Sequence, residues 1–189
     1  MPGAYGMVTS ANSPSPYRGG LFGPDFEHSV FISEPVHNLV HREMLAPDGI
    51  TFTSHRAKGE EKSEFLASSD NWFRPAMTKT GPDGALYVAD MYRLVIEHPK
   101  WIPLGMQSRV NLREGSNRGR IWRVLPKGSK LRKTPRLDRM STKTLVTALD
   151  SPNGWQRDTI QRLLLARGGE DASADLRKLA QTSKSPKVR

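Results

Sequence analysis

The chain has no cysteine among its 189 residues, which excludes disulfide bridges, thiolate metal sites, cysteine nucleophiles and a Cys-x-x-Cys-His haem attachment within it. No apolar run approaches the roughly 18 residues of a membrane-spanning helix, so we predict no span. The first residues, Met1 to Gly6, lack a basic region followed by an apolar stretch, and we therefore predict no signal peptide. Phosphate-binding loops, Gly-x-Ser-x-Gly elbows and His-Glu-x-x-His motifs are also missing.

The net charge is close to zero in the first two thirds of the chain and strongly positive in the last third. Residues 1–126 carry 14 Lys/Arg against 13 Asp/Glu, whereas residues 127–189 carry 15 against 6. This split accounts for nearly all of the net charge of +10 and indicates two parts of different character.

A tight turn that feeds a short strand is the most informative local pattern. In Gly81-Pro82-Asp83-Gly84, proline fixes φ at the first corner and the last glycine adopts positive φ at no steric cost. Residues 85–89 then read as a strand that is apolar on both faces and ends on Asp90, so we expect both faces to be covered. A strand covered on both faces behind a tight turn is typical of a β-propeller blade.

The same device occurs twice. Ala46-Pro47-Asp48-Gly49 also precedes a strand pattern, 35 residues before the turn at Gly81. The spacing is close to the roughly 40–45 residues of a four-stranded blade and supports a repeated β unit. Further strands are expected at 30–32, 38–45, 50–54 and 119–126, with loops at 13–20 and 56–64 and a long irregular stretch at 91–116.

The pattern becomes helical after Pro126. Ser141 is a candidate N-cap for a helix that ends near Leu149, and a second helix is expected from about Trp155 to Arg167. A Pro-Asn-Gly break separates the two, and a short third helix is expected over 172–181. Two antiparallel helices joined by a tight turn are the unit of an α-solenoid, which normally stacks on neighbouring units.

Several motifs taken in order resemble the membrane-bound dehydrogenase family of planctomycetes and verrucomicrobia. They are residues 31–42, 71–75, 81–93, 96–103 and 153–158, and the resemblance covers about residues 5–167. That family combines a sorbosone or glucose dehydrogenase-like β-propeller with HEAT-like helical repeats and often a haem-binding domain. The four β-region motifs in order make the resemblance specific, because a Gly-Pro-Asp-Gly turn alone is common in propellers.

The resemblance implies a mainly β fold with a C-terminal α part. Residues 1–126 would be the last blades, about two, of a partial β-propeller, and 127–136 a basic linker. Residues 137–182 would begin a HEAT-like repeat, and 183–189 would be a disordered tail. Since a propeller needs at least four blades to close, the chain is expected to be a fragment of a periplasmic or otherwise extracytoplasmic protein.

The resemblance further implies oxidation of a sugar or alcohol by the complete protein, with pyrroloquinoline quinone and calcium as candidate cofactors. We expect no cofactor within this chain, no metal site, and no activity of the chain alone. Haem c would require a further domain. The partners would be the sugar or alcohol substrate, further blades and further helical repeats.

Three polar residues are candidates for lining a propeller channel: Asn71, Arg74 and Asp90. Arg74 precedes a proline, so its backbone is expected to be extended, as at the entrance to an inner blade strand. Its guanidinium could hold a carboxylate or a quinone oxygen. The alternative is a structural ion pair in which Asp90 meets Arg74 or Arg93.

Other candidates lie in the loop after the strand and in the first β region. Tyr92 and Arg93 are further candidate ligand-binding residues, and His98 is a candidate general base or else a packed loop histidine. His37 is a candidate channel residue. On a strand, His37 and His41 lie about 13 Å apart, too far to share one metal ion.

Two other functional classes stay open. A non-catalytic interaction module would use the propeller and helices as a platform for a protein or glycan. The basic segment 127–143 could bind nucleic acid, but it has no aromatic residue for base stacking, so we favour a solvated surface and expect no nucleic-acid partner.

Overall fold

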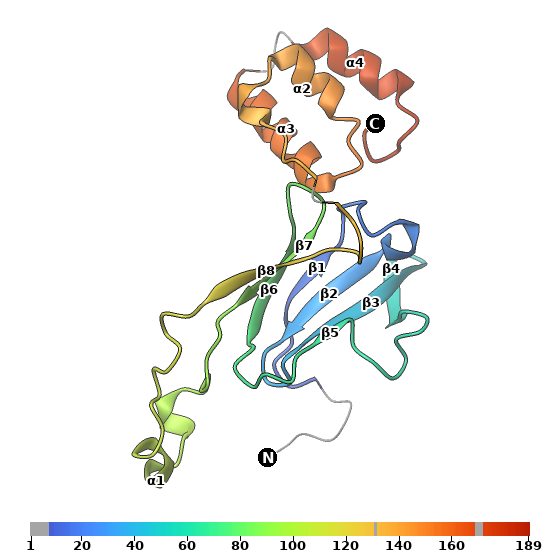
Figure 1. The fold of residues 1–189 in the computed structure, drawn as a ribbon. Coiled ribbons are helices and arrows are strands. Elements are labelled where there is room, and N and C mark those ends of the chain that lie inside the picture. Colours follow the sequence, from blue (N-terminus) through green and yellow to red (C-terminus); the bar gives the residue numbers. More distant parts are fainter. Residues whose placement is uncertain (1–7, 131, 169–171) are drawn as a thin grey trace. The chain divides into compact units, whose positions relative to one another are not determined.

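The computed structural model describes residues 8–130, 132–168 and 172–189, and shows two antiparallel sheets followed by helices (Figure 1). This confirms the expected change from a β region to an α region. The chain divides into two compact units. A β unit comprises residues 1–17, 28–79 and 87–124, and a helical unit comprises residues 18–27, 80–86 and 125–189.

The first sheet has five strands in the described residues and runs in the order β1-β2-β3-β4, with β5 paired to β3. The strands are β1 (Asn12–Pro16), β2 (Ser29–Glu34), β3 (Leu39–Asp48), β4 (Thr51–Arg56) and β5 (Leu66–Ala67). Strands β2 and β3 form a hairpin in which Phe31 lies opposite Arg42. Asn38 closes the turn between them with φ of 58°, a left-handed conformation that asparagine tolerates.

Strand β1 corrects the expectation of a loop over residues 13–20. Its proline-rich sequence predicts a loop, yet β1 pairs with β2 across a register shift between Asn12 and Ser15. Proline is tolerated there because, among the described strands, β1 pairs with β2 alone, so a missing N–H can face away from the ladder. Ser13, with φ of 51°, provides the irregularity.

The core of this sheet forms around Phe31, which is fully buried together with Val40. The ring of Phe31 meets that of Tyr17 edge to face at a centroid distance of 6.0 Å and that of Phe65 at 4.6 Å. Aromatic contacts in these geometries stabilise a core beyond simple area burial. Phe31 therefore joins three segments that are distant in sequence.

The second sheet runs in the order β6-β7-β8, with β6 at Pro75–Thr80, β7 at Leu86–Asp90 and β8 at Arg120–Val124. Leu86 and Val88 of β7 are buried, whereas Tyr87 and Ala89 are half-buried. Only one face of this strand is therefore fully covered, which differs from the expected cover on both faces. Strand β8 lies at the edge of the sheet and is largely exposed.

The turn predicted between β6 and β7 is confirmed. Gly81 and Ala85 close it through a backbone hydrogen bond of 2.8 Å, and Gly84 has φ of 88°. A Cβ at Gly84 would lie 2.6 Å from the carbonyl oxygen of Gly19. Both the conformation and the close approach of the loop at Gly19 require glycine at this position.

The stretch between β7 and β8 is long and irregular, as expected. It contains the short helices η2 (Pro99–Trp101) and α1 (Leu104–Gln107) and projects from the sheet (Figure 1). Trp101 is 74% exposed and Leu104 is more exposed still. The chain returns from this excursion to form β8.

The helical unit contains η1 (Pro24–Phe26), η3 (Leu137–Arg139), α2 (Thr142–Ala148), α3 (Gly154–Ala166) and α4 (Ser173–Thr182). The predicted cap is present, since Ser141 Oγ accepts the Thr144 N–H at 3.3 Å. The expected helices differ from α2, α3 and α4 by only a residue or two at their ends. Their shared core consists of Leu137, Leu145, Val146, Ile160, Leu164 and Ala172.

Two loops from the β region belong to the helical unit. Asn153 caps α3 by accepting the Trp155 N–H at 2.9 Å, and its amide also donates to the carbonyl oxygens of Gly81 and Pro82, each at 3.0 Å. The N–H of Gly154 donates to the carbonyl of Arg18 at 2.7 Å. The first turn of α3 is therefore fixed to both loops.

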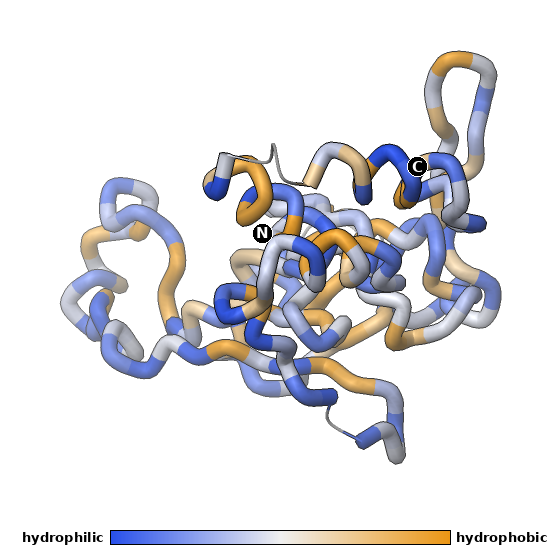
Figure 2. Tube along the Cα trace, turned by 90° about the horizontal axis from the view of Figure 1, so that it is seen from above, coloured by the Kyte–Doolittle hydropathy of each residue, from blue (hydrophilic) through white to orange (hydrophobic). Residues whose placement is uncertain are grey.

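Hydrophobic and hydrophilic residues alternate over short distances along the trace (Figure 2). No helix among the described residues is long and apolar enough to cross a membrane.

Candidate functional site

Asp90 is the centre of a buried polar cluster in the β unit. It ends β7, is 3% exposed, and accepts three hydrogen bonds. One carboxylate oxygen accepts the backbone N–H groups of Arg74 and Tyr92, each at 2.8 Å, and the other accepts the indole N–H of Trp122 at 2.9 Å. The Nε atom of Arg120 lies 3.9 Å from the second oxygen. The buried charge is thus compensated by fixed donors.

Arg74 uses its guanidinium for backbone contacts. Nε donates to the carbonyl of Arg93 at 3.0 Å, Nη1 to Pro35 at 2.9 Å and more distantly to Val36, and Nη2 to Leu94 at 3.1 Å. Burial lowers the pKa of Arg74, and the nearby charge of Glu97 opposes this effect. The guanidinium therefore joins the β2–β3 turn to the segment after β7.

An aromatic–arginine cluster, which we define as Asp70, Trp72, Tyr92, Arg120 and Trp122, lies beside Asp90. The Arg120 guanidinium stacks on the Tyr92 ring with its central carbon 3.4 Å from the centroid, and it lies 5.5 Å from the Trp122 ring centroid. The rings of Trp72 and Tyr92 are 5.6 Å apart. Stacking of this kind holds the arginine in one orientation.

Tyr92 adopts an unusual backbone conformation in this cluster. Its φ of 51° lies in the left-handed region, which a bulky residue rarely enters. A Cβ at Gly115 would collide with the Tyr92 carbonyl oxygen, so the glycine permits the chain to pass closely. Strain of this kind persists where the surroundings determine the conformation, and here the Asp90 carboxylate and the Arg120 stack do so.

Asp70 fixes the exposed side of the cluster. Its carboxylate accepts the Trp72 N–H at 3.0 Å and the Tyr92 hydroxyl at 2.9 Å. These two hydrogen bonds, with a smaller contribution from the charge of Arg120, lower the pKa of Asp70. Trp122 is 44% exposed, so the cluster presents aromatic, cationic and anionic groups at an accessible surface.

The structure brings Arg74, Asp90, Tyr92 and Arg93 together and leaves the other predicted residues outside this network. Arg93 donates from Nη2 to the Leu112 carbonyl at 2.9 Å, and its Nε is buried without a hydrogen-bond partner among the described residues. Asn71 is exposed, and its carbonyl oxygen accepts a hydrogen bond from Asn38 at 3.3 Å.

The histidines have local roles. His98 is exposed and caps η2, since its Nδ1 accepts the Lys100 N–H at 3.1 Å. His37 lies in the turn after β2 with Nδ1 at 3.4 Å from Glu34. His41, on β3, has one ring nitrogen 2.6 Å from Glu64 and the other 2.6 Å from Glu43.

The carboxyl of Glu64 is held by two hydrogen-bonding neighbours, the His41 ring and the Arg56 guanidinium. Burial acts to raise its pKa, but hydrogen bonds from His41 and from Arg56, the latter at 2.7 Å, outweigh burial and lower the pKa. This ion cluster ties the loop after β4 to the sheet.

Arg120 and Trp122 were missed as site residues, although the strand that carries them was predicted. A usable signal was present, because residues two apart on a strand share a face and an Arg-x-Trp pair on one face is a common stacking unit.

These features define a mixed protein in which two antiparallel sheets precede a set of helices, with a stacked aromatic–arginine surface on the second sheet. Residues 2–128 match a family model described as a domain of unknown function, DUF7133. The match spans more than half of the chain, and the chain belongs to this family. Comparison with curated proteins and with solved structures found no match.

Proposed function

We propose that the chain is a non-catalytic binding module, in which two blade-like sheets and a helical repeat unit present the aromatic–arginine cluster to a glycan. Support for the blade interpretation comes from strand order. Strands β1 to β4 pair as an antiparallel meander, and β6 to β8 pair as a shorter one, which is the connectivity of propeller blades. In this proposal the chain contributes to a larger, extracytoplasmic propeller of dehydrogenase-like type.

The observation that carries the binding role is the state of Asp90 and Arg74. Both carboxylate oxygens of Asp90 accept N–H groups, and all three guanidinium nitrogens of Arg74 donate to backbone carbonyls. A catalytic acid, base or cofactor ligand needs an available donor or acceptor. Fixed partners of this kind favour a structural role for Asp90 and Arg74 over contacts to a quinone or a calcium ion, and we derive no catalytic step through them.

The glycan preference follows from the chemistry of the exposed groups. Sugar rings combine apolar C–H faces with many hydroxyls, and they suit a surface that combines aromatic faces with planar charged hydrogen-bonding groups. Trp122 provides such a face, Arg120 provides donors, and Asp70 retains acceptor capacity beside its two hydrogen bonds. Their orientations are fixed before binding, which limits the entropy cost of association.

The test is titration of the full chain with cellotetraose and with maltotetraose, monitored by tryptophan fluorescence. We expect at least one of the two sugars to bind, and Trp122→Ala and Arg120→Gln each to weaken binding at least about fivefold. Trp101→Ala is the matched control, because Trp101 is exposed on the excursion and lies outside the cluster. Absence of binding by both sugars, or equal weakening by Trp101→Ala, would refute the proposal.

A second candidate function is the sugar or alcohol oxidation implied by the resemblance to membrane-bound dehydrogenases. The observation that favours it is the buried Nε of Arg93, which donates to no described group and is available to donate to an acceptor on an adjoining segment or ligand. In this alternative the oxidation requires further blades. Turnover of glucose by this chain with added pyrroloquinoline quinone, calcium and an electron acceptor would favour catalysis over the binding module.

A further inference from the structure

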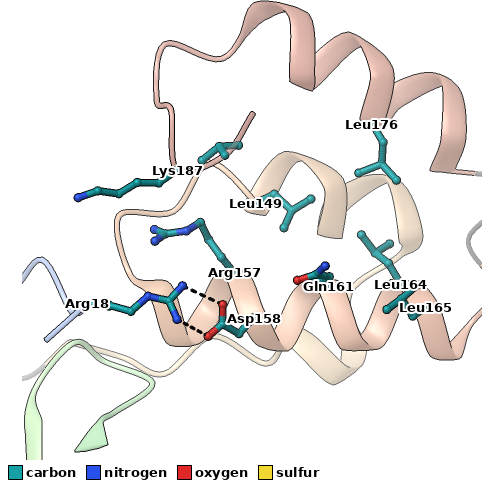
Figure 3. A pocket seen from close by; sticks show the side chains of 10 residues that line it. Arg18, Leu149, Arg157, Asp158, Gln161, Leu164, Leu165, Leu176 and Lys187 are labelled. Atoms are coloured by element: carbon teal, nitrogen blue, oxygen red, sulfur yellow. Dashed lines mark hydrogen bonds and ion pairs between the residues drawn. The ribbon is translucent and has the colours of Figure 1, made fainter. Parts of the chain in front are cut away.

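A cavity of about 600 Å³ lies within the helical unit, between α3, α4 and the C-terminal segment (Figure 3). Its two ends differ in chemistry. The side chains of Arg18, Arg157 and Asp158 gather at one end, and those of Leu164, Leu165 and Leu176 lie at the other (Figure 3). Its volume falls in the range of about 300–1,000 Å³ that small-molecule sites occupy.

The charges at the polar end are unevenly compensated. Arg18 forms two hydrogen bonds with the Asp158 carboxylate, at 2.7 and 2.9 Å, and the Lys187 ammonium lies 3.4 Å from Glu27. Arg157 pairs with no carboxylate among the described residues. Its guanidinium donates from Nη1 to the carbonyl oxygen of Ser151 at 2.6 Å.

Arg157 is also the most buried of these cations, with 9% of the residue exposed. Burial lowers its pKa first, and the neighbouring charge of Arg18 lowers it further, while Asp158 opposes both effects. A guanidinium in such surroundings gains from a carboxylate that approaches through the cavity, since arginine donors form strong paired hydrogen bonds with carboxylates.

The apolar end is made by leucines of α3 and α4 and by Leu149, which directly follows α2. Leu149 and Leu176 pack against the helical core, and Leu164 belongs to it. Leu165 is 72% exposed, although it lies on the same helix and lines the same cavity. An aliphatic chain placed along these side chains would remove apolar surface from water at the protein and on the ligand.

We propose that this cavity binds an aliphatic carboxylate, with the carboxylate on Arg157 and the chain along Leu164, Leu165 and Leu176. The proposal does not depend on the glycan surface of the β unit, because every residue that lines the cavity belongs to the helical unit. It requires both ends of the ligand: the charge for Arg157 and the hydrocarbon for the leucines.

The first experiment compares three probes on the full chain by calorimetry and by amide chemical-shift mapping. Octanoate carries both features, butyrate lacks the long chain, and octanol lacks the charge. We expect octanoate to bind and to shift amides of α3 and α4, and the other two probes to bind at least about tenfold more weakly. Equal binding of octanol and octanoate, or no binding of octanoate at millimolar concentration, would overturn the proposal.

The second experiment uses variants at each end of the cavity. Arg157→Gln should weaken octanoate binding at least about tenfold while leaving octanol binding unchanged. Leu165→Gln, at an exposed position that the fold does not need, should weaken binding of octanoate severalfold. The matched controls are Lys178→Gln on α4 and Leu104→Gln on α1, exposed residues outside the cavity, which should bind as the parent chain does.

Leu165→Gln keeps the test decisive if Arg157→Gln does not fold, because its circular dichroism should match the parent chain. Unchanged octanoate binding in a folded Leu165→Gln variant would contradict the assigned position of the hydrocarbon. Equal weakening by Lys178→Gln would show that general positive charge, not Arg157, attracts the ligand, and would contradict the proposal.

Discussion

Asp90 in the β unit and Arg157 in the helical unit are both buried charged residues, but they differ in how their polar atoms are used. The Asp90 carboxylate accepts three N–H groups from Arg74, Tyr92 and Trp122. The Arg157 guanidinium donates to one backbone carbonyl and lines a cavity. A charged group whose polar atoms all have fixed hydrogen-bond partners organises its surroundings. A charged group next to a cavity that keeps hydrogen-bonding capacity is available to a ligand.

This difference separates the predicted channel residues from the groups that are available to a ligand. The sequence predicts Arg74 and Asp90 as channel residues because Arg74 precedes a proline, as at the entrance to an inner blade strand, yet their contacts are those of a structural network. The exposed stack of Arg120 and Trp122 and the cavity at Arg157 retain hydrogen-bonding capacity and accessible apolar surface. Available groups, and not charge alone, identify the better candidates.

The largest effect is expected for Asp90→Ala. The substitution leaves three N–H donors without their acceptor in a buried site, and we expect a loss of about 3–5 kcal/mol in the free energy of unfolding, measured by urea denaturation. Asp90→Asn retains one acceptor oxygen but places an amide NH2 group against an N–H donor. Its loss in the free energy of unfolding should therefore be smaller than that of Asp90→Ala.

The matched control for Asp90 is Asp48→Ala, at an exposed carboxyl at the end of β3, which should change stability by less than about 0.5 kcal/mol. An Asp90→Ala variant as stable as this control would break the comparison, because Asp90 would then not organise its surroundings. A much larger loss for Arg157→Gln than for Asp90→Asn would break it from the other side.

A smaller loss, about 2–3 kcal/mol, is expected for Asn153→Ala. The polar atoms of Asn153, in the helical unit, already have hydrogen-bond partners. The variant therefore tests whether these partners, or the unit in which a residue lies, determine the loss in the free energy of unfolding. Loss of the Asn153 side chain removes the cap of α3, for about 1 kcal/mol, and also removes one hydrogen bond to each of the carbonyls of Gly81 and Pro82, which keep only their donors from Gly84 and Gln156.

Asn153→Asp separates the two contributions, because aspartate keeps the capping acceptor and lacks the amide donors. We expect it to be destabilised as well, since its carboxylate would face two carbonyl oxygens. If Asn153→Asp were as stable as the parent chain, the contacts to the loop at Gly81 would carry no stability. Urea denaturation followed by circular dichroism gives both values.

Much of the fold could be predicted where local physics decides the structure. The turn at Gly81 and the cap at Ser141 follow from backbone rules, and both are present. Strand β1 was not predicted, because its prolines obey the local rule for a loop and only edge pairing with β2 overrides it. Local rules cannot show which strand lies at an edge.

The site was less predictable than the fold. Arg74, Tyr92 and Arg93 around Asp90 were identified, but the hydrogen-bond partners in this network come from positions up to 39 residues away in the chain, as with Arg74 and Pro35. The cavity at Arg157 depends on Arg18, whose carboxylate partner is 140 residues away. Contacts with such distant residues decide whether a charged group has hydrogen-bonding capacity left for a ligand. Residue type alone could therefore not separate the charged groups with fixed partners from those that are accessible.

The smallest effect is expected from the Glu64 carboxyl, a partly buried group whose charge is already balanced. Its neighbours are His41, Arg56 and, through His41, Glu43; Arg42 and Glu60 form the adjacent pair. Since these contacts lower the folded-state pKa of Glu64, its stabilising contribution is complete above the unfolded value of about 4.3 and is lost as pH falls through the folded pKa. Glu64→Gln should therefore reduce the pH dependence of the free energy of unfolding below about pH 4.3, measured by urea denaturation. The reduction should be less than about 1 kcal/mol because the group is partly solvated.

Glu114→Gln, at an exposed carboxyl of the excursion, should keep the parent pH dependence. If Glu64→Gln also kept the parent pH dependence, the contacts around His41 would contribute nothing to the loss of stability in acid. Occupied hydrogen-bonding positions would then predict a stabilising role only for a fully buried charge such as Asp90.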